Sequence, residues 1–162
     1  MKIATKTGDF KMTDTLSGRV RKDDPLIECL GTVDELQAHL MHARIVVKDP
    51  EIKTHLETLA WELFLLGGVL LDPEKRFGEE KTKALEEKIE IYEAKLPGQK
   101  GFKLPGRTET GSRLHIARTV ARRLERRIVT LGRCREIDAD VFAYVNRLSD
   151  LLYIYARAEE EL

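Results

Sequence analysis

The sequence is poor in cysteine, proline and aromatic residues, and it has no long apolar run. Its 162 residues include 2 Cys and 5 Pro, and 6% are aromatic. Cys29 and Cys134 form no C-x-x-C pair and have no histidine at metal-binding spacing, so we expect reduced, mostly buried thiols in a cytoplasmic protein and no zinc site. No apolar run approaches the roughly 18 residues that span a bilayer, and the first residues, MKIATKTGDF, lack the apolar core of a signal peptide.

The chain also lacks net charge. Lys and Arg total 28 and Asp and Glu total 28, so no overall field draws the protein to nucleic acid or to an acidic membrane. Hydrophobic residues are 42% and charged residues 35%, a composition typical of a folded, helix-rich protein. The length suits one domain, which we place at 1–162.

Apolar residues recur with the helical period along most of the chain after an irregular arm at 1–24. Thr32 and Glu35 have the spacing of a capping box, and Asp49-Pro50 marks a second helix start. The pattern predicts an all-α fold at 25–162, a five-helix, ferritin-like up-down bundle with a long break at 96–111. The expected helices are at about 32–47, 50–71, 79–95, 112–131 and 139–162.

The fourth predicted helix contains LHIARTVARRLERR at 114–127, with five arginines in ten residues. At 100° per residue its apolar side chains fall in one sector, and Arg118, Arg122 and Glu125 lie along one border of that sector. A part-buried guanidinium there needs an anion, either a carboxylate or a ligand phosphate. A solvated face with i,i+4 ion pairs is the alternative. Arg126 points away, Arg123 and Arg127 lie toward the other border, and His115 falls on the outward side, which favours a structural role.

The arm contains Thr5-Lys6-Thr7-Gly8-Asp9, which joins hydroxyls, a cation and a glycine outside any helix. Such a segment can wrap phosphates with backbone N–H groups while its lysine supplies charge. It does not match a P-loop, because the spacing and the strand–loop–helix context are absent. An ordinary surface turn is the alternative interpretation.

Four segments in this order resemble the PduO-type ATP:cob(I)alamin adenosyltransferases over nearly the whole chain. They are TKTGD, KDDP…GTVDEL (22–36), FKLPG with the arginine helix, and YVNRLSDLLYIYAR (144–157). The resemblance implies a homotrimer with its active site between adjacent subunits. It implies transfer of the 5′-deoxyadenosyl group of ATP to cob(I)alamin, with release of triphosphate and with Mg²⁺ among the neutralising charges. The alternative is a weakly active or non-catalytic relative that binds ATP or cobalamin for regulation or delivery.

The resemblance also implies residue roles. Thr5, Lys6, Thr7, Gly8, Asp9 and Lys22 would wrap ATP, Arg122 would bind phosphate, and Arg123, Glu125, Arg126 and Asn146 would complete the nucleotide site. Asp34 and Arg118 would pair across the subunit interface near the corrin, and Phe102 would exclude the lower axial ligand of cobalt. No protein ligand for a metal is expected. A reductase or a cobalamin-dependent acceptor enzyme would be the partner.

These assignments have structural alternatives. Phe102 could plug the end of the bundle, and Asp34 could serve only the helix dipole. Asn146 is a poor helix former among apolar neighbours, and a buried amide requires partners.

Three residues depart from the family pattern and bear on ATP affinity and turnover. Lys11 stands where a glycine is usual, and a positive φ there would cost lysine on the order of 1 kcal/mol. Asp14 would repel triphosphate unless it holds Mg²⁺. Arg107 replaces a glycine after Pro105-Gly106.

Overall fold

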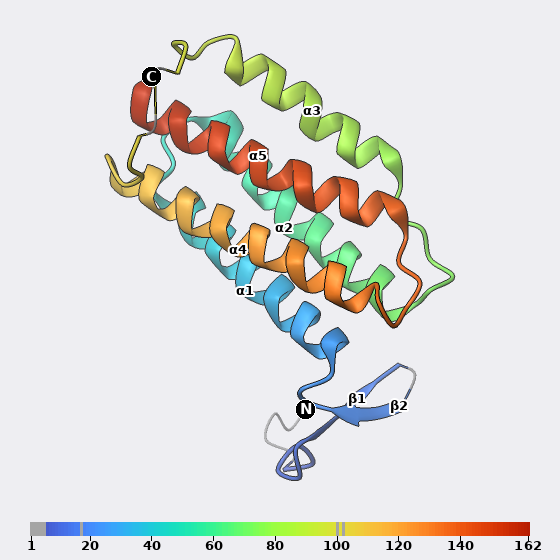
Figure 1. Cartoon of the computed structure of the whole chain (residues 1–162). Helices are drawn as coiled ribbons and strands as arrows, with labels where there is room; N and C mark the ends of the chain where they lie inside the picture. Colours follow the sequence, from blue (N-terminus) through green and yellow to red (C-terminus); the bar gives the residue numbers. More distant parts are fainter. Residues whose placement is uncertain (1–5, 17, 100, 102) are drawn as a thin grey trace.

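Five α-helices form the body of the protein, and a small β-hairpin precedes them (Figure 1). The structure is a computed structural model that describes residues 6–16, 18–99, 101 and 103–162. The helical five-helix fold predicted from the sequence is confirmed, and successive helices alternate in direction along the bundle (Figure 1). The helices are α1 (Pro25–Val46), α2 (Pro50–Leu71), α3 (Glu79–Glu93), α4 (Glu109–Leu131) and α5 (Ala139–Glu161).

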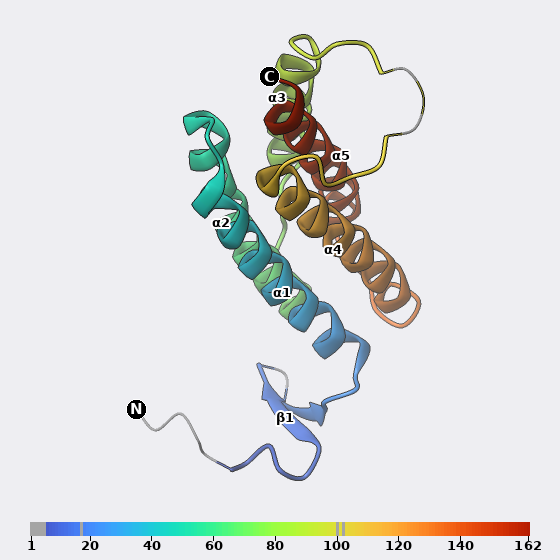
Figure 2. The same ribbon diagram turned by 90° about the vertical axis from the view of Figure 1, so that its left-hand side faces the viewer.

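The helices lie in two groups. Helices α1 and α2 pack together, α4 packs on both α1 and α5, and α3 packs on the other side of α5. Turned by 90°, the molecule shows α3, α4 and α5 on one side and α1 with α2 on the other (Figure 2). A groove opens over α5 between α3 and α4.

Helix α1 begins earlier than the sequence analysis predicted. Asp24 is its N-cap and accepts a hydrogen bond from the Leu26 N–H at 2.8 Å, with Pro25 in the first turn. Thr32 lies inside the helix, where its hydroxyl donates to the Glu28 carbonyl, so the predicted capping box is wrong. The start of α2 is as predicted, because the Asp49 carboxylate caps it. Both helices use the same signal, a capping carboxylate followed by proline.

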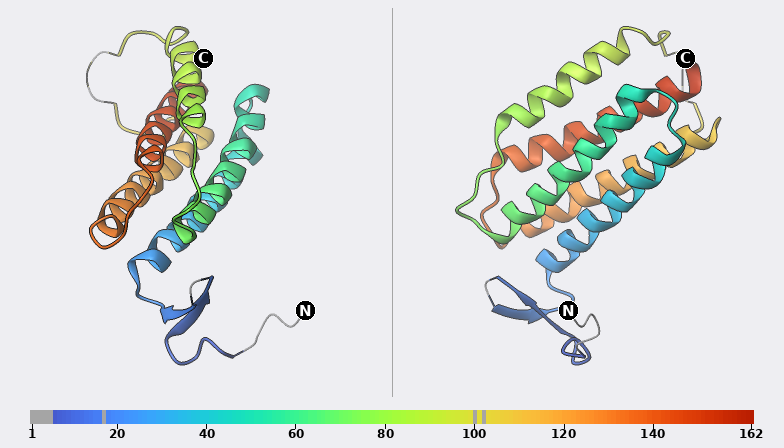
Figure 3. Two further views of the ribbon diagram at one scale, coloured as in Figure 1. Left: turned by 90° about the vertical axis from the view of Figure 1, so that its right-hand side faces the viewer. Right: turned by 180° about the vertical axis from the view of Figure 1, so that it is seen from behind.

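The arm contains regular structure that the sequence analysis did not predict. β1 (Met12–Thr15) pairs antiparallel with β2 (Gly18–Arg21), with Met12 opposite Arg21. The hairpin stands beyond the end of the bundle, next to the start of α1 (Figures 1 and 3). The strands are short and have no buried residues, so they lack the alternating apolar pattern that identifies a strand in sequence.

The core is formed mainly by leucines from all five helices, with three buried tyrosines among them. A buried hydroxyl needs a hydrogen-bond partner, and each tyrosine has one. The pairs are Tyr92 with Asp49 (3.0 Å), Tyr144 with Glu62 (2.7 Å) and Tyr155 with His55 (2.6 Å). Among the described residues only α2 has the length and apolar composition that a membrane span would need. It is apolar on its core face and also on an exposed face that includes Trp61 and Phe64.

Candidate active site

A cleft of about 790 Å³ lies over α5, between α3 and α4. Arg118 and Arg122 line it from α4, and Tyr153 lines it from α5. Glutamates of α3 form the facing wall, and residues 96–99 of the connection to α4 close one end. The cleft is therefore basic on the α4 side and acidic on the α3 side.

Two further arginines in the cleft are already neutralised. Arg147 pairs with Asp150 at 2.8 Å and with Glu86 at 3.3 Å. Arg157 pairs with Glu161 at 3.0 Å, and this pair is buried. These arginines hold the walls of the cleft together, and their charges are not available to a ligand.

Arg118, Arg122 and Arg126 form no ion pair with any described residue, and of these three arginines only Arg118 and Arg122 line the cleft. Arg118 is half-buried, and its Nε donates to His115 Nδ1 at 3.2 Å. Burial, and next the like charge of Arg122, lower the pKa of Arg118. Arginine nevertheless stays charged in proteins. Two neighbouring cations without a carboxylate form a local excess of positive charge that favours an anion.

The other border of α4 has no such excess. Arg127 pairs with Glu28 of α1 at 2.8 Å, and Arg123 forms an ion pair with Glu35. Arg127 also donates to the Thr32 hydroxyl. Arg123, expected in the nucleotide site, is thus engaged with its own α1 and does not line the cleft.

The polar residues predicted near the arginines interact with one another. Asn146 Nδ2 donates to Glu125 Oε1 at 2.9 Å across the α4–α5 contact. Asn146 is exposed, so the expectation of a buried amide is wrong. Arg126 donates to the Arg122 carbonyl at 2.9 Å. Because Glu125 forms no ion pair among the described residues, it does not neutralise Arg122.

In the described part of the arm the Lys22 side chain lies against Gly8. A Cβ placed on Gly8 would lie 2.9 Å from Lys22 Nζ, so the missing side chain lets the ammonium approach the backbone. The Lys22 N–H donates to the Lys11 carbonyl at 3.0 Å. Lys6 and Lys11 have φ of +62° and +61°, which confirms the positive φ considered for Lys11. Thr5 lies outside the described residues.

Asp14, the unusual acidic residue of the arm, forms an ion pair with Arg19. The Arg19 guanidinium lies 3.3 Å from the Asp14 carboxylate and also donates to the Thr7 carbonyl. Asp14 is therefore paired within the hairpin. The same guanidinium ties the segment that contains Gly8 to strand β2.

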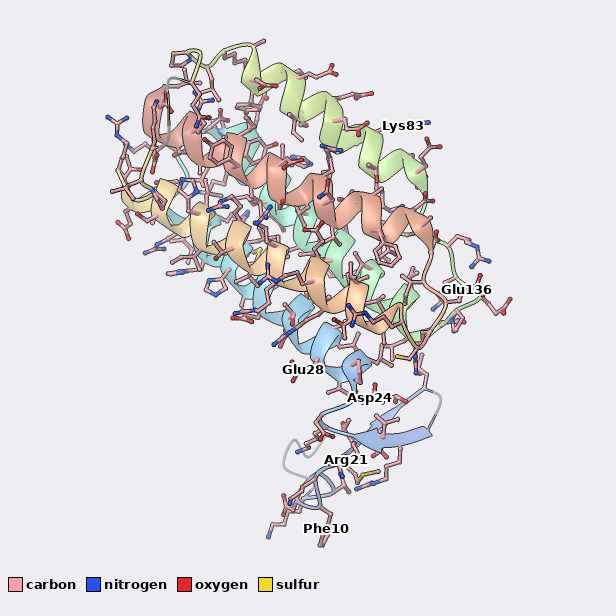
Figure 4. The ribbon with its side chains drawn as sticks, in the orientation of Figure 1. Phe10, Arg21, Asp24, Glu28, Lys83 and Glu136 are labelled. Atoms are coloured by element: carbon pink, nitrogen blue, oxygen red, sulfur yellow. The ribbon has the colours of Figure 1, made fainter. Side chains whose placement is uncertain are left out.

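Within one chain, the two halves of the predicted site are apart. The arm projects beyond the start of α1, and the labelled Phe10 points away from the bundle (Figure 4). Asp34 is exposed on α1 and lines hollows with Phe64, whereas Arg118 lines the α4–α5 cleft. No hydrogen bond or ion pair joins the described arm, or Asp34, to Arg118 or Arg122. Phe102 lies outside the described residues.

The sequence analysis missed the contacts that hold the connection between α3 and α4. The Tyr153 hydroxyl donates to Gln99 Oε1 at 2.7 Å, and Arg157 donates to the Pro97 carbonyl at 2.7 Å. The Glu160 carboxylate accepts from the backbone N–H groups of Gly106 and Arg107. No local pattern identifies these contacts, because their partners lie more than 50 residues apart in the chain.

The fold and the cleft define a helical-bundle protein whose cleft has a basic wall on the α4 side. The sequence profile of the family described as cobalamin adenosyltransferase matches residues 3–159, and the chain belongs to this family. The corrinoid adenosyltransferase PduO of Citrobacter freundii is 41% identical over 168 residues, which cover 99% of this chain and 50% of that protein. The corrinoid adenosyltransferase of Bacillus subtilis is 40% identical, with coverage of 97% and 86%. The chain thus spans about half the length of the PduO relative.

The fold is similar to that of solved structures from the same family. A variant of the PduO-type ATP:corrinoid adenosyltransferase from Lactobacillus reuteri, complexed with cobalamin and ATP, aligns with a TM-score of 0.91 and 36% identity over 98% of this chain and 91% of that one. A second variant, complexed with ATP, aligns with a TM-score of 0.92 over 98% and 94%.

Proposed function

We propose that this protein transfers the 5′-deoxyadenosyl group of ATP to cob(I)alamin, in a site that two copies of the chain build together. The observation that carries the proposal is that Arg118 and Arg122 lack a carboxylate partner among the described residues, while Arg123, Arg127 and Arg147 each have one. The relatives that cover most or all of this chain are named corrinoid adenosyltransferases, and the similar solved structures are complexed with ATP, which supports the triphosphate of ATP as the anion.

The reaction requires neutralisation of a leaving polyphosphate. The electron pair of cobalt(I) forms the Co–C bond to C5′ of the ribose, and the electrons of the broken C5′–O bond leave with triphosphate. Arg122 would meet the charge that develops on the leaving oxygens, where fixed cations are most effective. Lys6, Lys22 and the backbone N–H groups near Gly8 would wrap the rest of the chain of phosphates.

The sequence resemblance implies that the site also binds Mg²⁺ and cobalamin. Among the described residues no group of three or more His, Cys, Asp or Glu side chains could hold a metal ion. A Mg²⁺ ion that accompanies ATP would be bound by phosphate oxygens, water and one or two carboxylates, as is usual for this ion. Phe102 would cover the lower face of the corrin and keep an axial ligand off cobalt.

A trimer of these ferritin-like bundles would join the two halves of the site. Helix α2 exposes Trp61 (65%) and Phe64 (62%), which line one hollow together with Asp34 of α1. An exposed apolar patch of this kind marks a protein interface. The partner surface would be the α4–α5 cleft of a second copy, because Arg118, which has no carboxylate partner among the described residues, complements Asp34. The arm, whose Phe10 is 82% exposed, would then reach the neighbour's Arg122.

The first experiment measures transfer directly. The protein is incubated with ATP, Mg²⁺ and chemically reduced cobalamin, and the absorbance spectrum of adenosylcobalamin is recorded. Its appearance supports the enzyme. Full ATP binding without spectral change would instead favour a protein that binds ATP or cobalamin for delivery or regulation, which is the alternative that the strained Lys11 raises.

The second experiment tests the shared site by mixing two inactive variants, Lys22→Ala and Arg122→Ala. If the arm of one copy serves the arginines of its neighbour, mixed trimers contain interfaces in which both halves are intact. Random assembly would restore about a quarter of the wild-type activity. If both halves came from one chain, mixing would restore nothing. A monomer in light scattering would also overturn the shared site.

A further inference from the structure

His115 lies directly behind the wall of the cleft. It is only 8% exposed, and it precedes Arg118 by one turn of α4. Arg118 Nε donates to its Nδ1 at 3.2 Å, and its ring tilts against the ring of Tyr153 with centroids 6.0 Å apart. Arg118 and Tyr153 line the cleft, whereas His115 does not. The sequence analysis placed His115 on the outward side of the helix, and this prediction is wrong.

The contact with Arg118 determines the protonation state that His115 must have. Nδ1 can accept the Arg118 N–H only if it carries a lone pair, so the ring is the neutral tautomer with its proton on Nε2. Burial, and next the charge of Arg118, lower the pKa of His115, while the Glu160 carboxylate opposes them. Arg118 is the charged group on its own helix, Glu160 faces it from α5, and the Tyr153 hydroxyl is directed to Gln99.

The neutral ring restricts where the guanidinium can point. A long arginine side chain loses rotamer freedom when it binds an anion, and a fixed Nε reduces that cost in advance. A protonated imidazole would donate from both nitrogens and would repel the guanidinium. Arg118 would then turn away from Nδ1 and lose its fixed direction.

We propose that His115 is a positioning residue, whose neutral imidazole aims the Arg118 guanidinium into the cleft for the ion pair with Asp34 of a second copy. The ion pair rests on the proposed function. The contact between His115 and Arg118 does not, because both residues belong to one chain. Histidine suits this task better than a carboxylate, since it accepts a hydrogen bond without cancelling the charge of Arg118.

Two substitutions separate positioning from packing. His115→Asn places an amide oxygen near the position of Nδ1, while His115→Phe fills the space without an acceptor. We expect His115→Phe to lower kcat/KM for cobalamin about tenfold, the worth of one hydrogen bond, and to leave the KM for ATP unchanged. His115→Asn should recover most of this loss. In the wild type we expect turnover to decline at acid pH, where His115 becomes protonated. His115→Asn should remove this decline.

The control is His55→Phe, which replaces a half-buried histidine that contacts Tyr155 rather than the cleft. It should lower stability without changing KM for cobalamin. The proposal is overturned if His115→Phe turns over like the wild type, if His115→Asn fails to recover the loss, or if His115→Asn keeps the wild-type acid decline.

A readout independent of turnover is the ¹⁵N NMR spectrum of the folded wild-type protein. We expect an unprotonated Nδ1 in His115 and a slowly exchanging Arg118 Nε–H. A protonated Nδ1 at neutral pH would overturn the proposal even if the protein transferred no adenosyl group. An absence of transfer with the expected spectrum would count only against the proposed function.

Discussion

Arg157 and Glu161 form an ion pair one helical turn apart on α5, with Nε and Oε1 separated by 3.0 Å and both side chains less than a tenth exposed. Hydrogen bonds from Arg157, and next from Lys103, hold the pKa of Glu161 at about 2. Arg157 also donates to the Pro97 carbonyl. The last turn of α5 therefore anchors the connection that closes one end of the cleft.

The substitution Glu161→Gln should destabilise the protein by about 3 kcal/mol, because it leaves the Arg157 charge buried without a counter-charge. Chemical unfolding monitored by circular dichroism measures the effect. Glu109→Gln is the matched control, since it removes the partner of Arg113 at an exposed position and should cost less than about 1 kcal/mol. Equal losses in the two variants would contradict the role of burial.

The substitution Arg122→Ala should lower adenosyl transfer by at least about 10²-fold and leave the trimer and the melting temperature unchanged, because Arg122 is exposed and has no ion pair among the described residues. Arg127→Ala should instead lower the melting temperature and leave adenosyl transfer unchanged. It removes the contacts with Glu28 and Thr32 but no group of the cleft. Steady-state rates and thermal melts of both variants test the contrast, and wild-type turnover of Arg122→Ala would count against the site.

The substitution Asp34→Asn should raise the KM for cobalamin and leave ATP binding unchanged, because the proposed partner of Asp34 is Arg118 near the corrin rather than the triphosphate. Titration calorimetry with ATP and steady-state kinetics with cobalamin separate the two effects. Glu35→Gln, which removes the partner of Arg123 within the chain, should not change the KM for cobalamin. An effect of Asp34→Asn on ATP affinity alone would refute its assigned role.

The substitution Lys11→Gly should stabilise the arm by about 1 kcal/mol, because glycine adopts the observed φ of +61° without the steric cost that lysine has. The Lys22 N–H, which donates to the Lys11 carbonyl, should then exchange more slowly with solvent. Lys11→Ala removes the charge but keeps the strain, so it should give no added protection. If the Lys22 N–H exchanged equally slowly in both variants, the loss of the lysine charge, rather than the relief of strain, would explain the effect.

Stability should fall as the pH decreases from about 6.5 to about 4. Burial, and next the charge of Lys88, lower the pKa of His55 from 6.5 to about 4 in the folded protein. Between these values the unfolded chain binds more protons than the native state, so acid favours unfolding. His55→Gln should flatten the decline of unfolding free energy between pH 7 and pH 5, and the exposed His42→Gln should not. The same slope in His55→Gln and wild type would exclude His55 as its source.

Much of the helical fold could be predicted from local features. The ends of α2 and α5 follow from apolar periodicity and capping residues, and the angular positions on α4 correctly placed Arg123 and Arg127 on the border opposite Arg118. The start of α1 was missed because the spacing of Thr32 and Glu35 was interpreted as the capping box, whereas Asp24 followed by Pro25 caps the helix. The hairpin at 12–21 was missed because its exposed strands have no apolar alternation.

The sequence by itself determined which segments are helical and which side chains of α4 share a border, because both depend on residues within a few turns of one another. Only the tertiary structure decided which arginines are neutralised. Glu28 and Glu35 reach α4 from a helix that lies about 90 residues earlier, and Glu86 reaches Arg147 across α3 and α5. His115 is buried although it lies outside the apolar sector of α4, because the ring of Tyr153 from α5 packs against it. Charge balance and burial depend on which helices pack together, and local periodicity contains no information about that choice.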